Sequence, residues 1–131
     1  MTRPLSTIRK RADFIAANSG LRVARPGFVL LVKPNARDGE GRGTRFGITV
    51  TKRIGNAVVR NRMKRRFREL LRDALPERGL PDHDHILIGR EGGVERDFTA
   101  MQAELDEALA RAAAGKGDKP RGRRPRPDRR R

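Results

Sequence analysis

Nine basic side chains and one acidic side chain lie between Lys52 and Arg72. The basic residues are Lys52, Arg53, Arg60, Arg62, Lys64, Arg65, Arg66, Arg68 and Arg72. Arginine predominates, and its planar guanidinium can donate two parallel hydrogen bonds to phosphate oxygens or to a guanine edge. No nucleophile–base arrangement or pair of carboxylates accompanies these cations, so the segment indicates binding of a polyanion and not catalysis by side chains.

The periodicity of this segment predicts a helix with two distinct faces. Asn56 is a good N-cap for a helix that starts at Ala57. At about 100° per residue, one third of the helix is apolar and most of the remainder is cationic. The apolar third contains Met63, Phe67, Leu70 and Leu71. Arg60 projects into this apolar arc, which suggests a specific partner or a side chain extended along the seam.

Repulsion on the cationic face argues for an external ligand. Arg60, Lys64, Arg68 and Arg72 form a like-charged series at spacings of four, and Arg65–Glu69 is the one opposite pair at that spacing. Each like-charged pair destabilises a helix by a few tenths of a kcal/mol. A polyanion that neutralises the face is therefore favoured over the alternative, a face that is merely solvated.

Composition narrows the class of polyanion. The 131 residues carry a net charge of +16, have no cysteine, and contain no run of ~18 apolar residues that could span a bilayer. We therefore expect a cytoplasmic protein that binds nucleic acid and not a membrane. The sequence contains no visible helix-turn-helix pair, zinc finger or zipper repeat, so RNA is favoured over DNA.

Two further polar clusters have simpler interpretations. Asp82, His83, Asp84 and His85 are metal-ligand residue types, but no other histidine and no cysteine completes a set, so we predict a polar loop that enters a strand and no metal site. The glycine-rich segment 39–43 does not precede a helix, which favours a flexible loop between strands over a phosphate-binding loop.

The remaining patterns predict an α+β fold, a two-layer α/β sandwich with the order α-β-β-α-β-α. The first helix is expected to begin after Ser6 or Thr7 and to end near Asn18. The last is expected to begin at a capping box that starts at Thr99. Strands are predicted at 28–32, 45–51 and 86–88, the first two as a hairpin, and the segment from Pro76 to Pro81 is predicted to be a loop.

The C-terminal segment differs in composition from the rest of the chain. Residues 115–131 contain nine lysines or arginines against two aspartates, among glycines and prolines. Such a segment has too little apolar surface to offset the entropy lost on ordering. We therefore predict one RNA-binding domain at 1–114 and a disordered basic tail at 115–131.

The segment from Phe46 to Glu69, with Arg60-Asn61-Arg62 at its centre, resembles the signature of the bacterial ribonuclease P protein subunit. The similarity extends to Asp13-Phe14, to the strand that begins at Phe28 and to the segment from Asp84 to Arg90. It covers roughly residues 8–112.

That resemblance implies an accessory subunit of a tRNA-processing endoribonuclease, in which a catalytic RNA removes the 5′ leader of precursor tRNA. It implies a left-handed βαβ crossover, Mg²⁺ held mainly by RNA, and no catalytic protein side chain. The implied RNA-binding residues are Lys52, Arg53, Asn56, Arg60, Asn61, Arg62, Lys64, Arg65 and Arg68. Phe14 would line a cleft for the leader.

One departure from the family pattern concerns this cleft. Asn18 and Leu31 stand where family members often place further aromatic residues, so leader binding here would depend more on charge. Two other hypotheses remain open at this point, a ribosomal or other structural RNA-binding protein and a nuclease that acts without RNA.

Overall fold

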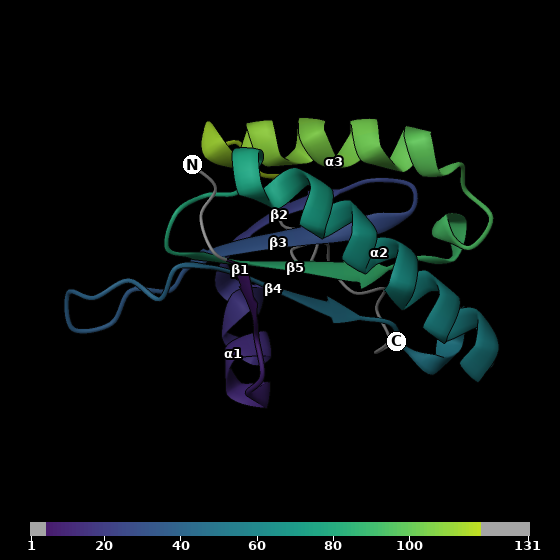
Figure 1. The fold of residues 1–131 in the computed structure, drawn as a ribbon, viewed down its shortest axis with the longest axis horizontal. Coiled ribbons are helices and arrows are strands. Elements are labelled where there is room, and N and C mark those ends of the chain that lie inside the picture. The colour runs from purple at the N-terminus through teal and green to yellow at the C-terminus, as the bar shows by residue number, and fades with distance from the viewer. Residues whose placement is uncertain (1–4, 119–131) are drawn as a thin grey trace, which may run out of the picture.

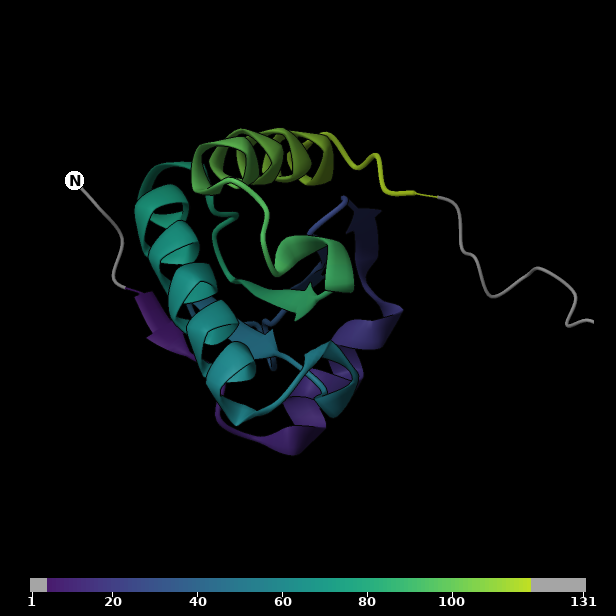
Figure 2. The ribbon, with the colours of Figure 1, turned by 90° about the vertical axis from the view of Figure 1, so that its right-hand side faces the viewer.

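A computed structural model describes residues 5–118 as one five-stranded sheet with three α-helices (Figure 1). The strands are β1 (Leu5–Thr7), β2 (Leu21–Ala24), β3 (Phe28–Pro34), β4 (Thr44–Thr49) and β5 (His83–Gly89). The helices are α1 (Arg11–Ala16), α2 (Ala57–Arg78) and α3 (Phe98–Ala113). Helices α2 and α3 form a layer on one face of the sheet, and α1 lies on the opposite face (Figures 1 and 2). The predicted α+β class is confirmed.

The sheet has the order β1-β4-β5-β3-β2, with β4 parallel to both β1 and β5. The path from β4 through α2 to the adjacent strand β5 is left-handed (Figures 1 and 2). Most β-strand–crossover–β-strand units are right-handed. The crossover implied by the family resemblance is therefore present, and it packs α2 against the face of the sheet that contains the Phe46 side chain of β4.

Strand β3 is apolar throughout because both of its faces are buried. Phe28, Leu30 and Val32 pack against α2 and α3, whereas Val29 and Leu31 belong to a second cluster on the α1 face. A strand covered on both sides reads as a continuous apolar run and not as an alternating one. The main core thus lies between the sheet and α2–α3, and a smaller core lies under α1.

Helix α2 begins and docks as its sequence predicts. The Asn56 side chain accepts a hydrogen bond from Val59 N–H at 3.0 Å, and the predicted apolar third is buried, extended by Ala74 and Leu75. The predicted loop at Pro76 was wrong, because the helix continues through this proline to Arg78. A proline in the last turn removes one intrahelical hydrogen bond near a helix end, and the buried side chains just before it hold the turn.

The N-terminal prediction was wrong at its boundaries. Residues from Leu5 to Thr7 form strand β1, which pairs with β4, and α1 begins only at Arg11 without a side-chain cap. Ser6 and Thr7 are therefore ladder residues and not helix caps. The short α1 continues into a 3-10 turn at Ala17–Ser19.

The predicted hairpin between the strands at 28–32 and 45–51 was also wrong, because β3 and β4 are not neighbours in the sheet. Strand β5 lies between β3 and β4 and pairs with both. The actual hairpin partner of β3 is β2, a strand that the sequence prediction omitted. Buried strands must pair on both edges, and the connection through α2 brings β5 into this position.

The C-terminal part differs from prediction in its details. The N-cap of helix α3 is Asp97 and not the predicted Thr99. The Asp97 carboxylate accepts a hydrogen bond from Ala100 N–H at 3.0 Å. After α3 the chain reaches the outer edge of β2, where Asp118 N–H donates to the Arg22 carbonyl and Asp118 Oδ2 accepts from Ala24 N–H at 2.7 Å. The rest of the predicted disordered tail lies outside the described residues. Within residues 5–118, no helix is long and apolar enough to cross a membrane.

Candidate nucleic-acid interface

All nine predicted RNA-binding residues reach the surface at or near α2. Arg60, Lys64 and Arg68 are half-buried, and the others are exposed: Lys52, Arg53, Asn56, Asn61, Arg62 and Arg65. A 3-10 turn at Lys52–Ile54 leads from β4 into the helix and brings the first two cations to its N-terminal end. The predicted cationic residues therefore lie at the surface of α2 and of the turn that precedes it.

The position of Arg60 within the apolar arc has a local explanation. Its Nε donates a hydrogen bond of 3.1 Å to the Gly55 carbonyl, just before the helix. The Arg60 side chain is therefore held along the seam between α2 and the turn that precedes it. Lys64 and Arg68 follow at spacings of four, so these three cations form a stripe along one side of α2.

On its other side the cationic face contacts the segment that leads into α3. Arg66 donates a 2.6 Å hydrogen bond to the Arg96 carbonyl, and its guanidinium lies 5.7 Å from the centroid of the Phe98 ring. Arg62 is 3.9 Å from the exposed carboxylate of Glu95. Arg66 is thus a tether within the protein, while exposed ion pairs such as Arg62–Glu95 are weak and can be exchanged for a phosphate. The ion pairs among the described residues do not include Arg65–Glu69, the pair that sequence spacing suggested.

A cleft of about 610 Å³ lies between α1, the sheet and α2. Its apolar lining comprises Phe14, Ile15, Leu31, Ile48, Val50, Ile86 and Ile88. Arg9 and Arg11 border it at the start of α1, and Lys64 borders it from α2. An apolar floor with cations at its rim suits a strand whose bases stack and whose phosphates are negative.

Phe14 lines this cleft, and the two departures from the family pattern, Asn18 and Leu31, line it as well. Phe14 lies over Gly47 of β4, where a Cβ would come within 2.6 Å of its ring. The absence of a side chain at position 47 thus allows the ring to approach the strand closely.

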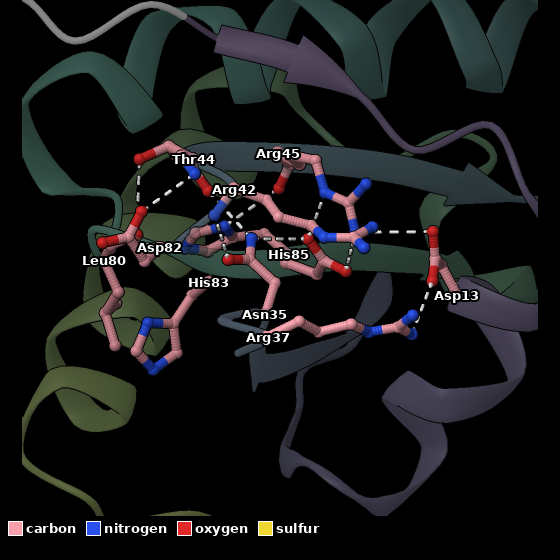
Figure 3. A network of polar contacts seen from close by, with 12 residues as sticks. Asp13, Asn35, Arg37, Arg42, Thr44, Arg45, Leu80, Asp82, His83 and His85 are labelled. Atoms are coloured by element: carbon pink, nitrogen blue, oxygen red, sulfur yellow. Dashed lines mark hydrogen bonds and ion pairs between the residues drawn. The ribbon is translucent and has the colours of Figure 1, made fainter. Parts of the chain in front are cut away.

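A buried ion-pair network holds α1 in place beside the cleft (Figure 3). Arg45 of β4 donates two hydrogen bonds of 2.7 Å to the Asp84 carboxylate of β5, and it lies 3.5 Å from the Asp13 carboxylate of α1. Hydrogen bonding to Asp84 raises the pKa of Arg45, against the opposing effect of burial. Asn35, the residue after β3, also donates from Nδ2 to Asp84 Oδ1 at 2.9 Å. The end of β3 thus joins β4, β5 and α1 in one network.

The aspartate–histidine cluster of residues 82–85 lies at the start of β5, and its side chains alternate between the two faces of the strand. Asp84 binds Arg45, whereas His85 is fully buried and bridges two main-chain groups (Figure 3). Its Nε2 accepts from Leu80 N–H at 3.0 Å, and its Nδ1 lies 3.1 Å from the Arg45 carbonyl, to which it donates as neutral imidazole. Burial lowers the pKa of His85 to about 4. These side chains therefore act as structural groups within the described fold.

Sequence reasoning missed part of the cleft. Arg9 and Arg11 are absent from the predicted binding residues, because a helix that starts after Ser6 or Thr7 would contain both of them. Arg45 and its partners were also missed, since a charged residue within a strand gives no signal of its partner across the sheet. A clue was available in Asp13, an acid in otherwise basic or apolar surroundings.

The left-handed crossover, the cationic helix and the cation-rimmed cleft define an RNA-binding protein of the α+β class. The family model "Ribonuclease P" matches residues 3–113. The ribonuclease P protein component of Erythrobacter litoralis is 70% identical over 124 residues, which cover 95% of this chain and 99% of that protein. The chain belongs to the ribonuclease P protein family.

Solved structures agree with this assignment. The ribonuclease P protein of Staphylococcus aureus superposes with a TM-score of 0.67 at 33% identity, covering 81% of this chain and 94% of that one. The Thermotoga maritima protein gives a TM-score of 0.67 at 28% identity, with coverage of 80% and 96%. The chain is therefore the protein subunit of a tRNA-processing ribonucleoprotein endoribonuclease, and it works with the ribonuclease P RNA.

Proposed function

We propose that the cationic face of α2 binds the catalytic RNA, and that the cleft beside it receives the single-stranded 5′ leader of precursor tRNA. The observation that carries this proposal is the position of Lys64, which belongs to the cationic stripe of α2 and also borders the cleft. Because these two RNA-binding surfaces of the protein meet at Lys64, they would align the leader with the catalytic RNA.

The charge distribution supports a division of work between the two surfaces. Residues such as Asn61 and Arg65 are exposed on α2, away from the cleft, where they suit phosphates of a folded RNA. The cleft instead combines aromatic and aliphatic side chains with a cationic rim, as in platforms for single-stranded RNA. The protein's contribution is thus binding and orientation of RNA.

Magnesium belongs to the RNA in this proposal. Within residues 5–118, no group of three or more His, Cys, Asp or Glu side chains could hold a metal ion. Asn56 Oδ1 already accepts the capping hydrogen bond of α2, which leaves it poorly placed as a ligand. RNA phosphates would hold the Mg²⁺ ions that hydrolysis requires.

The test is cleavage of precursor tRNA by holoenzyme reconstituted at low Mg²⁺. We expect the wild-type protein to raise the cleavage rate above that of the RNA alone. Lys64→Ala should weaken binding of a precursor with a leader more than binding of mature tRNA. Arg78→Ala is a matched control, because it removes the same charge at the far end of α2, where Arg78 pairs with Asp106.

The results separate the possible roles. Equal loss of affinity for precursor and mature tRNA would place the contact of Lys64 on the catalytic RNA and not on the leader. No stimulation by the wild-type protein would contradict the role in leader removal. Recovery of mainly ribosomal RNA with the purified protein would favour a structural RNA-binding protein instead.

A further inference from the structure

Strand β1 covers only part of the outer edge of β4. The two strands pair over residues 44–46 of β4, and Ile8 N–H donates to the Phe46 carbonyl at 2.8 Å. After Ile8 the chain turns away toward α1, which begins at Arg11. Beyond Phe46, the edge of β4 therefore has no neighbouring strand.

The peptide groups of Ile48 point to this uncovered edge. Peptide groups alternate between the two edges along a strand, so those of Ile48 point in the same direction as those of Phe46. Strand β4 keeps an unbroken register with β5 from Arg45 to Thr49, without a bulge that could reverse this alternation. Among residues 5–118, no backbone group pairs with Ile48 at the uncovered edge.

This uncovered edge opens into the cleft. Ile48, Thr49 and Val50 all line the cleft, opposite the side chains of α1. One residue thus presents a main-chain donor and a main-chain acceptor side by side, next to the ring of Phe14. The Watson–Crick edge of every nucleobase also carries a donor beside an acceptor, so the two are complementary.

The surrounding charge selects the partner. Uncovered sheet edges commonly bind a further peptide strand. Here Arg9, Arg11 and Lys64 border the same cleft, and a peptide backbone would leave their charges without counterions. A single strand of RNA supplies both a base edge for Ile48 and phosphates for the three cations.

We propose that the main-chain N–H and C=O of Ile48 bind the Watson–Crick edge of an unpaired nucleobase of single-stranded RNA in the cleft. This inference rests on the proposed function, in which the cleft receives the leader. A main-chain donor–acceptor pair can bind any of the four bases by a change of base orientation. The contact therefore provides affinity without strong selection for one sequence.

Amide exchange tests the contact directly in the full-length protein. On addition of a short oligouridylate, we expect slower hydrogen exchange at the Ile48 amide, measured by NMR. The Gly47 and Thr49 amides are internal controls, because they face β5 and are protected with or without RNA. Unchanged exchange at Ile48 with oligouridylate bound would overturn the proposal. So would protection that depends on protein concentration without RNA, since it would indicate edge pairing of two copies.

A modified ligand tests the base edge independently of any change in the protein. An oligomer of N3-methyluridine keeps the phosphates and the stacking surface but blocks the Watson–Crick edge. We expect its binding to be about three- to tenfold weaker than that of oligouridylate. Equal affinity of the two oligomers would overturn the contact with Ile48 while leaving the leader cleft intact. If neither oligomer perturbs Phe14 or Ile15, the proposed function of the cleft itself fails.

Ile48→Pro completes the test. Proline lacks the N–H and is tolerated on edge strands where that group points outward, whereas Ile48→Val keeps it and serves as the control. We expect Ile48→Pro to weaken binding of oligouridylate and to abolish the difference between methylated and unmethylated oligomers. A folded Ile48→Pro protein that still distinguishes the two oligomers would contradict the proposal. If this variant does not fold, the exchange and methylation results on the natural protein decide the question.

Discussion

The ring of Phe14 covers Gly47 so closely that a Cβ added to this glycine would lie 2.6 Å from Cε1 and 2.7 Å from Cζ of the ring. One residue belongs to α1 and the other to β4, so this contact sets how near the helix approaches the sheet. Because Phe14 also lines the cleft, the shape of the cleft depends on the absence of a side chain at position 47.

Gly47→Ala is expected to weaken leader binding without preventing folding. The added methyl group displaces the Phe14 ring, which is only half-buried and can rotate away. We expect a loss of about 1 kcal/mol in affinity for precursor tRNA, at the lower end of the range for a base stacked on an aromatic ring. Competition binding with precursor and mature tRNA measures this loss of affinity. In a Phe14→Ala background, Gly47→Ala should have no further effect. An undiminished effect there would show that Gly47 does not act through Phe14.

Acidification is expected to destabilise the protein through His85. The folded state holds this imidazole neutral, with a pKa of about 4. In the unfolded chain the pKa of the imidazole is about 6.5. Below that pH the unfolded state binds more protons, so the free energy of unfolding falls as pH decreases from about 6.5 to about 4, by up to roughly 3 kcal/mol. Urea unfolding across this range measures the slope. His85→Gln cannot protonate, and its stability should therefore lose this part of the pH dependence.

Loss of the Asp84 carboxylate is expected to be strongly destabilising. Asp84→Ala leaves the guanidinium of Arg45 mostly buried and without its bidentate partner, and breaking such pairs costs about 3–5 kcal/mol. Chemical denaturation measures the free energy of unfolding. Asp106→Ala removes one carboxylate from an exposed pair with Arg78 and should cost about 0–1 kcal/mol. Similar losses in the two variants would contradict the role assigned to the network.

Arg65 and Arg66 are adjacent in the chain but are expected to behave differently. Arg65→Ala should leave thermal stability unchanged, lower RNA affinity and reduce the slope of log Kd against log salt concentration by about 1, because one phosphate contact is lost. Arg66→Ala removes the hydrogen bond to the Arg96 carbonyl and the contact with Phe98. It should lower stability by about 1 kcal/mol.

Salt titrations of binding and thermal unfolding of the two variants provide the comparison. A larger change in salt dependence for Arg66→Ala than for Arg65→Ala would mean that the RNA-binding side of α2 faces α3. That outcome would contradict the division of the cationic face into a tether and a binding surface.

The sequence by itself determined the two faces of the cationic helix α2. Its 3.6-residue period, the Asn56 cap and the concentration of arginine are local properties, and they were sufficient to predict a docked apolar third with a cationic surface around it. The flanking motifs were sufficient for the family, because they cover most of the chain. Charge and period are read from neighbouring residues and need no knowledge of the fold.

Only the tertiary structure decided which residues meet. The parallel neighbour of β4 is β5, which follows α2 in the chain, and the short strand β1 covers β4 only as far as Phe46. Both facts depend on pairing between distant segments, about which local periodicity is silent. The cleft, the seating of Phe14 on Gly47, and the Arg45–Asp84 pair all follow from that pairing. The cationic residues of α2 could therefore be predicted from the sequence. The cleft lined by Phe14 depends on the order of the strands in the sheet, which the sequence pattern does not give.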